Sequence, residues 1–318
     1  MIENAELSYL LGMITGKGSL RRGNNNTDIF IQIPHKNLEI EDMNTSLSVR
    51  ASIQDIREII EPLTDSRMSV ITSDRSTTLK LSKPNENFFI REINKHFPNS
   101  RSAKEFRIPE EIFQARTDIK REFLIGLSDV TAHIRSSNAA YGHNFENRVY
   151  IEIPVNWYLT IDISNLLLDL NVPVQTIDWG HPNTRDPYLK DYNKGKTRVW
   201  FREHQIKIYA EQFENVGFRI HHKIEALHQL AEKNRVAWNN YCHKKAELAK
   251  TAEKRQEWLD KIDKLENKHN KFYWERRDIL REKPFHPMEN DERIPEVIKG
   301  EHFNSWREIA SALGYSRK

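Results

Sequence analysis

Two short segments of this 318-residue chain combine a nearly continuous apolar run with polar residues at its end. The first, LLGMITGKG, spans residues 10–18, and the second, LIGLSDVTA, spans residues 124–132. The first ends in Lys17 with a glycine on each side, whereas the second contains the carboxylate of Asp129 and the hydroxyl of Thr131. Carboxylate oxygens are ligands that Mg²⁺ takes in proteins, while an ammonium repels the ion. Among these three side chains, only Asp129 therefore has the chemistry of a metal ligand.

Histidine and cysteine spacing gives no indication of a metal site. The single cysteine, Cys242, excludes an internal disulfide framework and a cysteine-rich zinc site. The histidines are scattered without HExxH or similar ligand spacing, as is seen for His133, His143, His204, His221 and His222. We therefore expect no structural metal.

The composition leaves the class of partner open. The 49 lysines and arginines nearly balance the 46 aspartates and glutamates, and the formal net charge is +3. Acidic residues elsewhere can cancel a basic nucleic-acid-binding face, and an ordinary solvated surface gives the same totals. The sequence shows no signal-peptide pattern and no apolar run near the length of a membrane span. We expect a soluble cytoplasmic protein without a membrane partner, associated with the nucleoid if the source is a bacterium.

The residues around the first segment predict the elements that hold it. Residues 6–15 are apolar on all sides, which is typical of a helix buried at a packing interface. Gly16 and Gly18 permit the left-handed and turn conformations that end helices. The following residues alternate between strand and helix character, with a strand at 29–34, a helix at 37–63, a hairpin of 68–72 with 77–81, and a helix at 87–97.

The same order of elements recurs in the second part of the chain. Residues 123–129 repeat the buried helix, and VYIEIP at 149–154 repeats IFIQIP at 29–34 nearly residue for residue. In the same way, IKI at 206–208 repeats LKL at 79–81. Three similar pairs in one order indicate an internal duplication of an αββαββα unit, with a period too long for a solenoid.

Three further segments lie outside this duplication. Residues 180–197 are a polar insertion that we expect on the surface. Residues 234–283 are rich in lysine and glutamate, with apolar residues at helical spacing, which predicts a long helix or helical hairpin. The prolines within 284–287 end it, and WxxIAxxLGYS at 306–316 is similar to the first helix and turn of a helix-turn-helix. Either the chain is a fragment of a longer protein, or this tail is a plain terminal helix.

Segments 10–18 and 124–132 both resemble the nine-residue LAGLIDADG motif, and the duplication around them makes the resemblance specific. Flanking segments are also similar to those of the family: FRIPEEI at 106–112, KREFL at 120–124, and VGF at 216–218 with Lys223 and Leu227. The chain therefore resembles a double-motif LAGLIDADG homing endonuclease, and the resemblance extends to about residue 230.

The resemblance implies an α+β fold of two αββαββα halves about a pseudo-twofold axis, with saddle-shaped antiparallel sheets and a C-terminal helical extension. The two motif helices would pack side by side on this axis, where Gly12 and Gly126 let the backbones approach closely. The halves, the helical extension and the helix-turn-helix-like tail would comprise residues 1–115, 116–233, 234–287 and 288–318.

In this family, an acid at the eighth position of each motif binds the divalent metals that drive DNA cleavage. Here these positions are Lys17 and Thr131, so the resemblance implies no intact catalytic residue and no cofactor, with Mg²⁺ needed only if nuclease activity remains. Asp129, at a sixth position, is the one acid left in either motif. It would cap or pair locally, or form an ion pair with Lys17 across the helix interface. Lys17 would otherwise contact a DNA phosphate.

The β-hairpins of this family form a saddle whose strands lie in the major groove of DNA. Basic and amide side chains near the strands of this chain are therefore the expected DNA contacts. Because side chains alternate along a strand, only about half of them can face the groove. The candidates are Arg21, Arg22, Asn24, Asn25, Lys36, Lys80, Arg135, Asn138, His143, Arg198, Arg202 and Lys207.

The leading interpretation is a catalytically degenerate LAGLIDADG protein that binds double-stranded DNA sequence-specifically as a monomer. It would act as a regulator, or as the DNA-recognition part of a restriction or defence assembly with a further C-terminal domain or effector subunit. One alternative is an active site-specific endonuclease that uses non-family acids such as Asp129. Another is an RNA-binding maturase in intron splicing.

Overall fold

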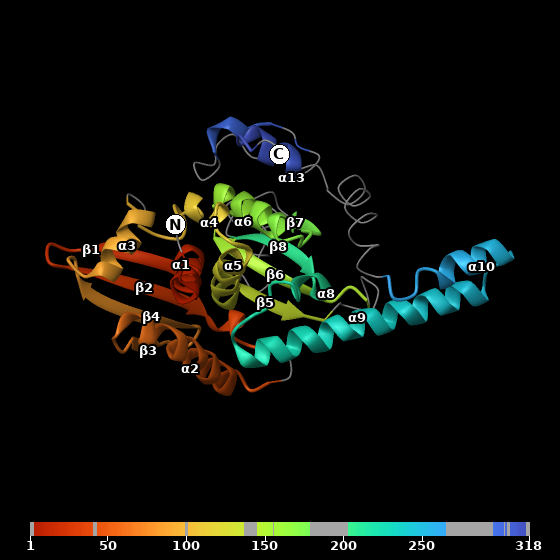
Figure 1. The fold of residues 1–318 in the computed structure, drawn as a ribbon, viewed down its shortest axis with the longest axis horizontal. Coiled ribbons are helices and arrows are strands. Elements are labelled where there is room, and N and C mark those ends of the chain that lie inside the picture. The colour runs from red at the N-terminus through yellow and green to blue at the C-terminus, as the bar shows by residue number, and fades with distance from the viewer. Residues whose placement is uncertain are drawn as a thin grey trace, which may run out of the picture.

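The computed structural model contains two similar units, one from each half of the chain (Figure 1). It describes residues 3–40, 43–98, 101–136, 145–154, 156–178, 203–264, 295–301, 303 and 306–315. The polar insertion predicted at 180–197 and most of the helical extension beyond residue 264 lie outside the described residues.

The first half has a four-stranded antiparallel sheet in the order β1-β2-β4-β3. Both hairpins are followed by helices, as the sequence predicts. The elements are α1 (Ala5–Lys17), β1 (Gly18–Arg22), β2 (Asn26–Pro34), the short 3-10 helix η1 (His35–Asn37), α2 (Thr45–Thr64), β3 (Ser69–Thr72), β4 (Ser76–Pro84), α3 (Phe88–His96) and α4 (Glu110–Phe113).

The second half repeats this arrangement, with a sheet in the order β5-β6-β8-β7. Its elements are α5 (Thr117–Thr131), β5 (Ala132–Arg135), β6 (Arg148–Pro154), α6 (Trp157–Asp169), β7 (Thr176–Asp178), β8 (Glu203–Tyr209), α8 (Ala210–Phe213) and α9 (His221–Glu247). The identical strand order in the two sheets confirms the predicted α+β fold with a duplicated αββαββα unit.

Each sheet has one face packed on the helices and one face directed away from them. In β2, Ile29, Ile31 and Ile33 are buried in the core, while Phe30 and Gln32 between them are more exposed. The alternating IFIQIP sequence therefore fixes which side chains leave the core. We call the face of each sheet that is directed away from the helices its outer face.

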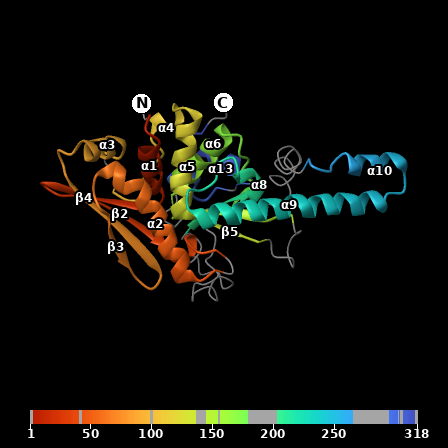
Figure 2. The ribbon, with the colours of Figure 1, turned by 60° about the horizontal axis from the view of Figure 1, so that its bottom comes forward.

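The motif helices α1 and α5 lie side by side at the centre of the molecule (Figures 1 and 2). A Cβ atom added to Gly12 would lie 2.0 Å from the Phe123 carbonyl oxygen, and one added to Gly126 would lie 1.9 Å from the Tyr9 carbonyl oxygen. Both obstacles are backbone atoms, which cannot turn aside as a flexible side chain can. Glycine at these two positions thus permits the close approach of the helices.

Gly16 and Gly18 also serve packing, and the prediction that they end α1 through left-handed or turn conformations was wrong. Helix α1 continues to Lys17, and Gly18 has an extended backbone with φ −85°. A Cβ atom on Gly18 would lie 2.4 Å from the Ile14 carbonyl oxygen, and one on Gly16 would lie 2.7 Å from Thr131 Cγ2. Gly16 is needed because the ends of α1 and α5 are close together, whereas Gly18 is needed because its backbone returns onto the last turn of α1.

Helix α2 begins eight residues later than the sequence predicts. Residues His35–Asn37 form η1, from which the Asn37 side chain donates to the Val130 carbonyl of α5 at 2.9 Å. The helix starts only after Asn44, whose side chain accepts a hydrogen bond from Leu47 N at 3.2 Å. An asparagine cap at this position satisfies a backbone donor that the helix itself leaves free.

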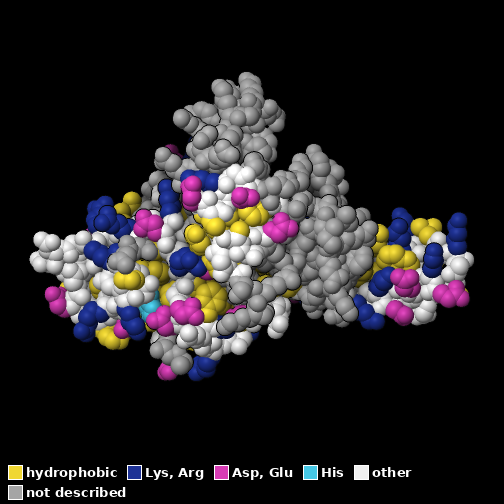
Figure 3. All heavy atoms as spheres, turned by 90° about the horizontal axis from the view of Figure 1, so that it is seen from above, with side chains coloured by type: hydrophobic (Ala, Val, Ile, Leu, Met, Phe, Trp, Pro, Cys, Tyr) yellow, Lys and Arg dark blue, Asp and Glu magenta, His cyan; other side chains and the backbone are white. Residues whose placement is uncertain are grey.

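Helix α9 is continuous across residue 233, which is the end of the predicted second half. Its buried Asn234 donates to the Asn147 carbonyl at 3.0 Å and accepts from Asn147 N at 2.9 Å. Beyond the body of the protein, α9 pairs with α10 (Ala252–Leu259), and Trp238 Nε1 donates to the Lys261 carbonyl at 2.9 Å. These two helices project from the second half as an arm (Figure 1), whose far end carries both basic and acidic side chains (Figure 3).

The C-terminal segment contains η4 (Glu296–Ile298) and α13 (Trp306–Ala312). It is attached to α6 through Tyr315, whose hydroxyl donates to Asp162 Oδ1 at 2.7 Å. The same carboxylate accepts two hydrogen bonds from Arg107, at 2.5 and 2.8 Å. Helix α13 lies where the sequence predicts the first helix of a helix-turn-helix, and the motif itself stays a prediction. Its second helix would begin at residue 316, outside the described residues, and stays a prediction. Within the described residues, no helix combines the length and apolar character needed to cross a membrane.

Candidate functional site

The two positions that carry acids in the family lie at the adjoining ends of α1 and α5. Thr131 is fully buried, and its hydroxyl donates to the Leu127 carbonyl one turn earlier at 2.7 Å. Lys17 is partly buried, which lowers the pKa of its ammonium, while the carboxylates of Glu203 and Glu152 oppose this shift. Neither side chain supplies a carboxylate oxygen at the helix ends.

The two carboxylates nearest to Lys17 are held by a second lysine. Lys36 Nζ lies 2.6 Å from Glu152 Oε2 and 2.9 Å from Glu203 Oε2, and so joins η1 of the first half to β6 and β8 of the second. Burial acts to lower the pKa of Lys36, but the attraction of both carboxylates outweighs it and raises the pKa. Lys36 was predicted to contact DNA, whereas its ammonium is engaged in these two ion pairs.

This arrangement does not fit Mg²⁺. The ammonium of Lys36 occupies the position between Glu152 and Glu203 where a cation would bind, and the pKa of Lys17 responds to the same two carboxylates. Within the described ranges, no cluster of three or more histidine, cysteine, aspartate or glutamate side chains is placed to hold a metal ion. The negative charge of Glu152 and Glu203, which a divalent ion could balance, is balanced here by Lys36.

Asp129 is directed into the core and does not pair with Lys17. Its Oδ2 atom accepts from the Tyr9 hydroxyl at 2.8 Å and from Arg219 N at 3.2 Å. Tyr9 and Lys17 are separated by more than two turns of α1, which is about 12 Å along the helix axis. The predicted ion pair between Asp129 and Lys17 was therefore wrong, and the local pairing of Asp129 was the better interpretation.

A buried lysine lies beside Asp129 at the end of α5. Lys223 Nζ donates to the carbonyls of Ser128, Asp129 and Ala132 at 3.3, 3.0 and 2.9 Å. Burial raises the pKa of Asp129 to about 6, and it lowers the pKa of Lys223. The pair has a structural role, because its ammonium satisfies carbonyls that the end of a helix leaves without partners.

The outer face of the first sheet carries two cations around one aromatic ring. Phe30 on β2 is directly opposite Lys80 on β4, and Lys80 Nζ lies 5.4 Å from the centre of the Phe30 ring. The Arg21 guanidinium lies over the same ring, also at 5.4 Å. Lys80 further pairs with Asp28 at 3.2 Å. Arg21 and Lys80 thus lie on the face directed away from the core, and their contact with DNA stays a prediction.

The outer face of the second sheet repeats this pattern at the same register. Tyr150 is directly opposite Lys207, whose Nζ lies 5.8 Å from the centre of the Tyr150 ring. His133 stacks on the other side of Tyr150, with ring centres 5.1 Å apart, and Arg135 is exposed at the end of β5. We call Arg21, Phe30 and Lys80, together with Arg135, Tyr150 and Lys207, the two sheet-face triads.

The other predicted DNA contacts are placed differently. Arg22 turns toward α3, where its Nε donates to Asn94 Oδ1 at 2.9 Å and its Nη2 donates to the Phe97 carbonyl. Asn24 and Asn25 are exposed in the turn between β1 and β2. The remaining four candidates lie outside the described residues: Asn138, His143, Arg198 and Arg202.

Several site residues were missed in the sequence. Phe30 and Tyr150 could have been found, because the alternation in IFIQIP and VYIEIP places both on the outer face. No local signal marks Glu152 and Glu203 as partners of Lys36, since these residues meet only through the packing of one half on the other.

No family model and no curated protein matches the chain. Among solved structures, it is similar to the homing endonuclease I-DmoI in complex with DNA and Mn, with 17% identity, a TM-score of 0.36, and coverage of 69% of this chain and 96% of that one. It is also similar to full-length DUF199/WhiA from Thermatoga maritima, with 13% identity, a TM-score of 0.37, and coverage of 83% and 82%. The N-terminal LAGLIDADG domain of DUF199/WhiA is similar at 14% identity and a TM-score of 0.34, with coverage of 74% and 85%.

These identities and TM-scores are low, and the chain's own features carry the assignment of the fold. The duplicated sheets have one strand order, and the two motif helices meet at Gly12 and Gly126. The chain has a LAGLIDADG-like fold.

Proposed function

We propose that this chain, with its LAGLIDADG-like fold, binds double-stranded DNA sequence-specifically through the outer faces of its two sheets and does not cleave it. The observation that carries the proposal is the pair of sheet-face triads. The same combination of arginine, aromatic ring and lysine occupies the same register in the two sheets. Arginine and lysine are the side chains that neutralise phosphates and read guanine edges in the major groove.

Differences between the two outer faces support an asymmetric DNA site. Asp28, opposite Arg21, corresponds to Arg148, opposite Arg135. Ser19, opposite Phe30, corresponds to His133, opposite Tyr150. His133 is buried, whereas Ser19 is partly exposed, so the two outer faces differ in charge and in exposed polar groups and suit different half-sites. A single chain then reads a long site as a monomer in the major groove.

The absence of cleavage follows from the chemistry at the helix ends. A LAGLIDADG nuclease needs a carboxylate at the end of each motif helix, and the residues here are Lys17 and buried Thr131. Lys36 already balances Glu152 and Glu203, so binding requires neither Mg²⁺ nor another cofactor. A protein that recognises a DNA sequence without cleaving it could serve as a regulator. It could also be the recognition part of a restriction or defence assembly whose effector is a further domain or subunit.

Selection of bound sequences from random duplex DNA tests this proposal directly. In EDTA, we expect enrichment of one long asymmetric site, with an affinity that falls steeply as salt rises because counterions are released. With Mg²⁺, a denaturing gel should show intact strands. Site-specific strand cuts would overturn the proposed loss of catalysis, and stronger binding to structured RNA than to any duplex would overturn DNA as the partner.

Substitutions in the triads test which surface binds. We expect Lys80→Met and Lys207→Met each to lower the slope of log K against log[salt] by about one, because each removes one phosphate contact. Lys80→Met should weaken binding more, since it also removes the ammonium that pairs with the Asp28 carboxylate on the outer face. Footprints should show that each variant loses protection over a different half-site.

Lys254→Met is the matched control for these two variants, because Lys254 is exposed on α10 of the projecting arm. Its binding and salt slope should equal those of the unmodified protein. If Lys80→Met and Lys207→Met behave like this control while all variants keep the same thermal midpoint, the outer faces are not the binding surface.

A further inference from the structure

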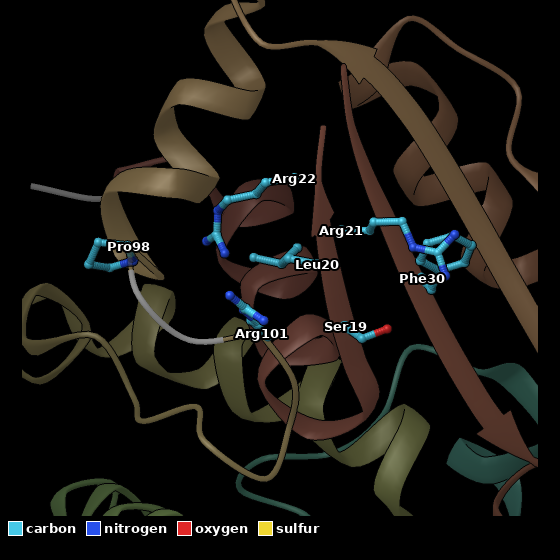
Figure 4. A pocket seen from close by; sticks show the side chains of 7 residues that line it. All are labelled: Ser19, Leu20, Arg21, Arg22, Phe30, Pro98 and Arg101. Atoms are coloured by element: carbon cyan, nitrogen blue, oxygen red, sulfur yellow. The ribbon is translucent and has the colours of Figure 1, made fainter. Parts of the chain in front are cut away.

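A cavity of about 610 Å³ lies along β1, at the edge of the first sheet (Figure 4). Three of its seven lining residues are arginines, and none is acidic. The lining consists of Ser19, Leu20, Arg21, Arg22, Phe30, Pro98 and Arg101. A concave site with converging cations and some apolar wall has the composition of an anion-binding pocket.

The position of Arg101 is fixed by the backbone next to β1. Leu20 N donates to the Arg101 carbonyl at 2.8 Å, and Ala103 N donates to the Gly18 carbonyl at 3.0 Å. The segment that carries Arg101 therefore runs along the edge strand as a short extension of the sheet. Glu105 lies nearby, and its carboxylate accepts from the Arg101 backbone N at 2.8 Å. The cavity wall is thus built by main-chain pairing, and a change of the Arg101 side chain leaves that pairing intact.

Arg22 is fixed from the opposite wall. Two of its guanidinium nitrogens donate to α3, one to Asn94 Oδ1 and one to the Phe97 carbonyl. Figure 4 shows Arg22 and Arg101 pointing toward one another on one side of β1, while Arg21 lies over Phe30 on the other side. Burial lowers the pKa of Arg22, and the like charge of Arg101 lowers it further. Two guanidinium groups held this close to each other favour an anion between them.

We propose that this β1-edge pocket is a phosphate-binding site formed by Arg22 and Arg101. Guanidinium groups bind phosphate oxygens through charge-assisted hydrogen bonds. Arg101 would donate to the phosphate, while Arg22, whose Nε and Nη2 already donate to protein acceptors, adds its positive charge.

The phosphate has two possible sources. Arg21 belongs both to the first sheet-face triad and to the lining of this pocket, so the pocket continues the outer face at its β1 edge. A backbone phosphate of bound DNA would therefore enter it next to the strand that reads the bases, and this form of the inference rests on the proposed function. The other source is a free phosphorylated molecule such as a nucleotide, which a cavity of this volume accommodates.

Arg101→Gln is the variant that tests the site, and Arg116→Gln is its matched control. Arg116 is an exposed arginine that pairs with its neighbour Asp118 at 2.6 Å, away from the pocket. Three probes are titrated against the full chain by calorimetry: inorganic phosphate, adenosine monophosphate, and the selected duplex over a salt series. We expect Arg101→Gln to weaken the binding of whichever probe enters the pocket about tenfold, because the variant loses a charge-assisted hydrogen bond to phosphate. For the duplex, the salt slope should also fall by about one.

The outcomes distinguish this inference from the proposed function. If Arg101→Gln loses binding of phosphate or nucleotide, the pocket is a phosphate-binding site. This conclusion holds even if the unmodified chain binds no duplex, and in that case only the proposed function is contradicted. A reduced slope for duplex only, with no binding of free phosphate or nucleotide, identifies the DNA backbone as the source. If Arg101→Gln and also the charge-reversing Arg101→Glu match Arg116→Gln with every probe, at an unchanged thermal midpoint, the pocket is not a phosphate site.

Discussion

Gly126→Ala is expected to destabilise the protein by about 3 kcal/mol or more, which makes it one of the two most damaging substitutions that we predict. The added methyl group would lie 1.9 Å from the Tyr9 carbonyl oxygen and 2.7 Å from the Tyr9 carbonyl carbon. Both are backbone atoms of α1, so the clash can be relieved only by moving the two motif helices apart. That movement would open the centre of the core, where α1 and α5 form the contact between the two halves.

Urea unfolding followed by circular dichroism measures this effect as a shift of the transition midpoint. Gly23→Ala is the control, because a Cβ atom there would meet one atom only, the Asn26 carbonyl oxygen at 3.1 Å, in the turn between β1 and β2. Gly23→Ala should change the midpoint little. An unchanged midpoint in Gly126→Ala would mean that the helices are not packed as closely as described.

Lys223→Met is expected to destabilise the protein by about 3 kcal/mol or more, because it leaves buried carbonyls without a donor and removes a buried positive charge beside Asp129. The ammonium donates to three carbonyls at the end of α5 and lies beside the buried carboxylate of Asp129. Methionine matches the length of lysine but donates no hydrogen bond. The carbonyls would lose their partner, and the Asp129 carboxyl, whose pKa burial already raises, would lose the nearby positive charge that lowers it.

Asp129→Asn in the Lys223→Met background separates these two losses. Neutralising Asp129 removes the uncompensated charge, so the double variant should be more stable than the sum of the single effects by at least about 1 kcal/mol. Lys233→Met, on the exposed side of α9, is the control and should leave the unfolding midpoint nearly unchanged. Strictly additive effects of the two buried substitutions would contradict the coupling between Asp129 and Lys223.

The sequence predicted the architecture well, because repeats and alternation are local signals. The strands at 29–34 and 149–154, the glycines of the motif helices and the duplicated order of elements all follow from short patterns. Errors arose where a tertiary contact overrides the local pattern. The residues from Asn37 to Asn44 have helical composition, yet Asn37 is drawn into a contact with Val130 of the other half.

The candidate site was predictable only in part, for a related reason. Lys36 and Arg22 are charged residues next to strands, and nothing in their neighbourhood indicates partners. In the folded chain, Lys36 meets Glu203, which is 167 positions away, and Arg22 meets Asn94, which is 72 positions away. For Asp129, the sequence left local pairing and an ion pair with Lys17 both open, because spacing along a motif does not determine which way a side chain leaves the helix. Arg101 had no signal, because only its pairing with β1 brings it to the pocket.

Helix α9 connects the interior of the molecule to a remote point outside it. At its start, Lys223 is fixed to the end of α5, and toward its other end Trp238 is fixed to the α10 segment. Its 27 residues span about 40 Å, which is the length of about twelve base pairs of DNA. Because the helix is unbroken, it fixes the distance between its two ends. The far end of the arm is thereby kept at a set distance and orientation from the central axis, a little more than one turn of a double helix away.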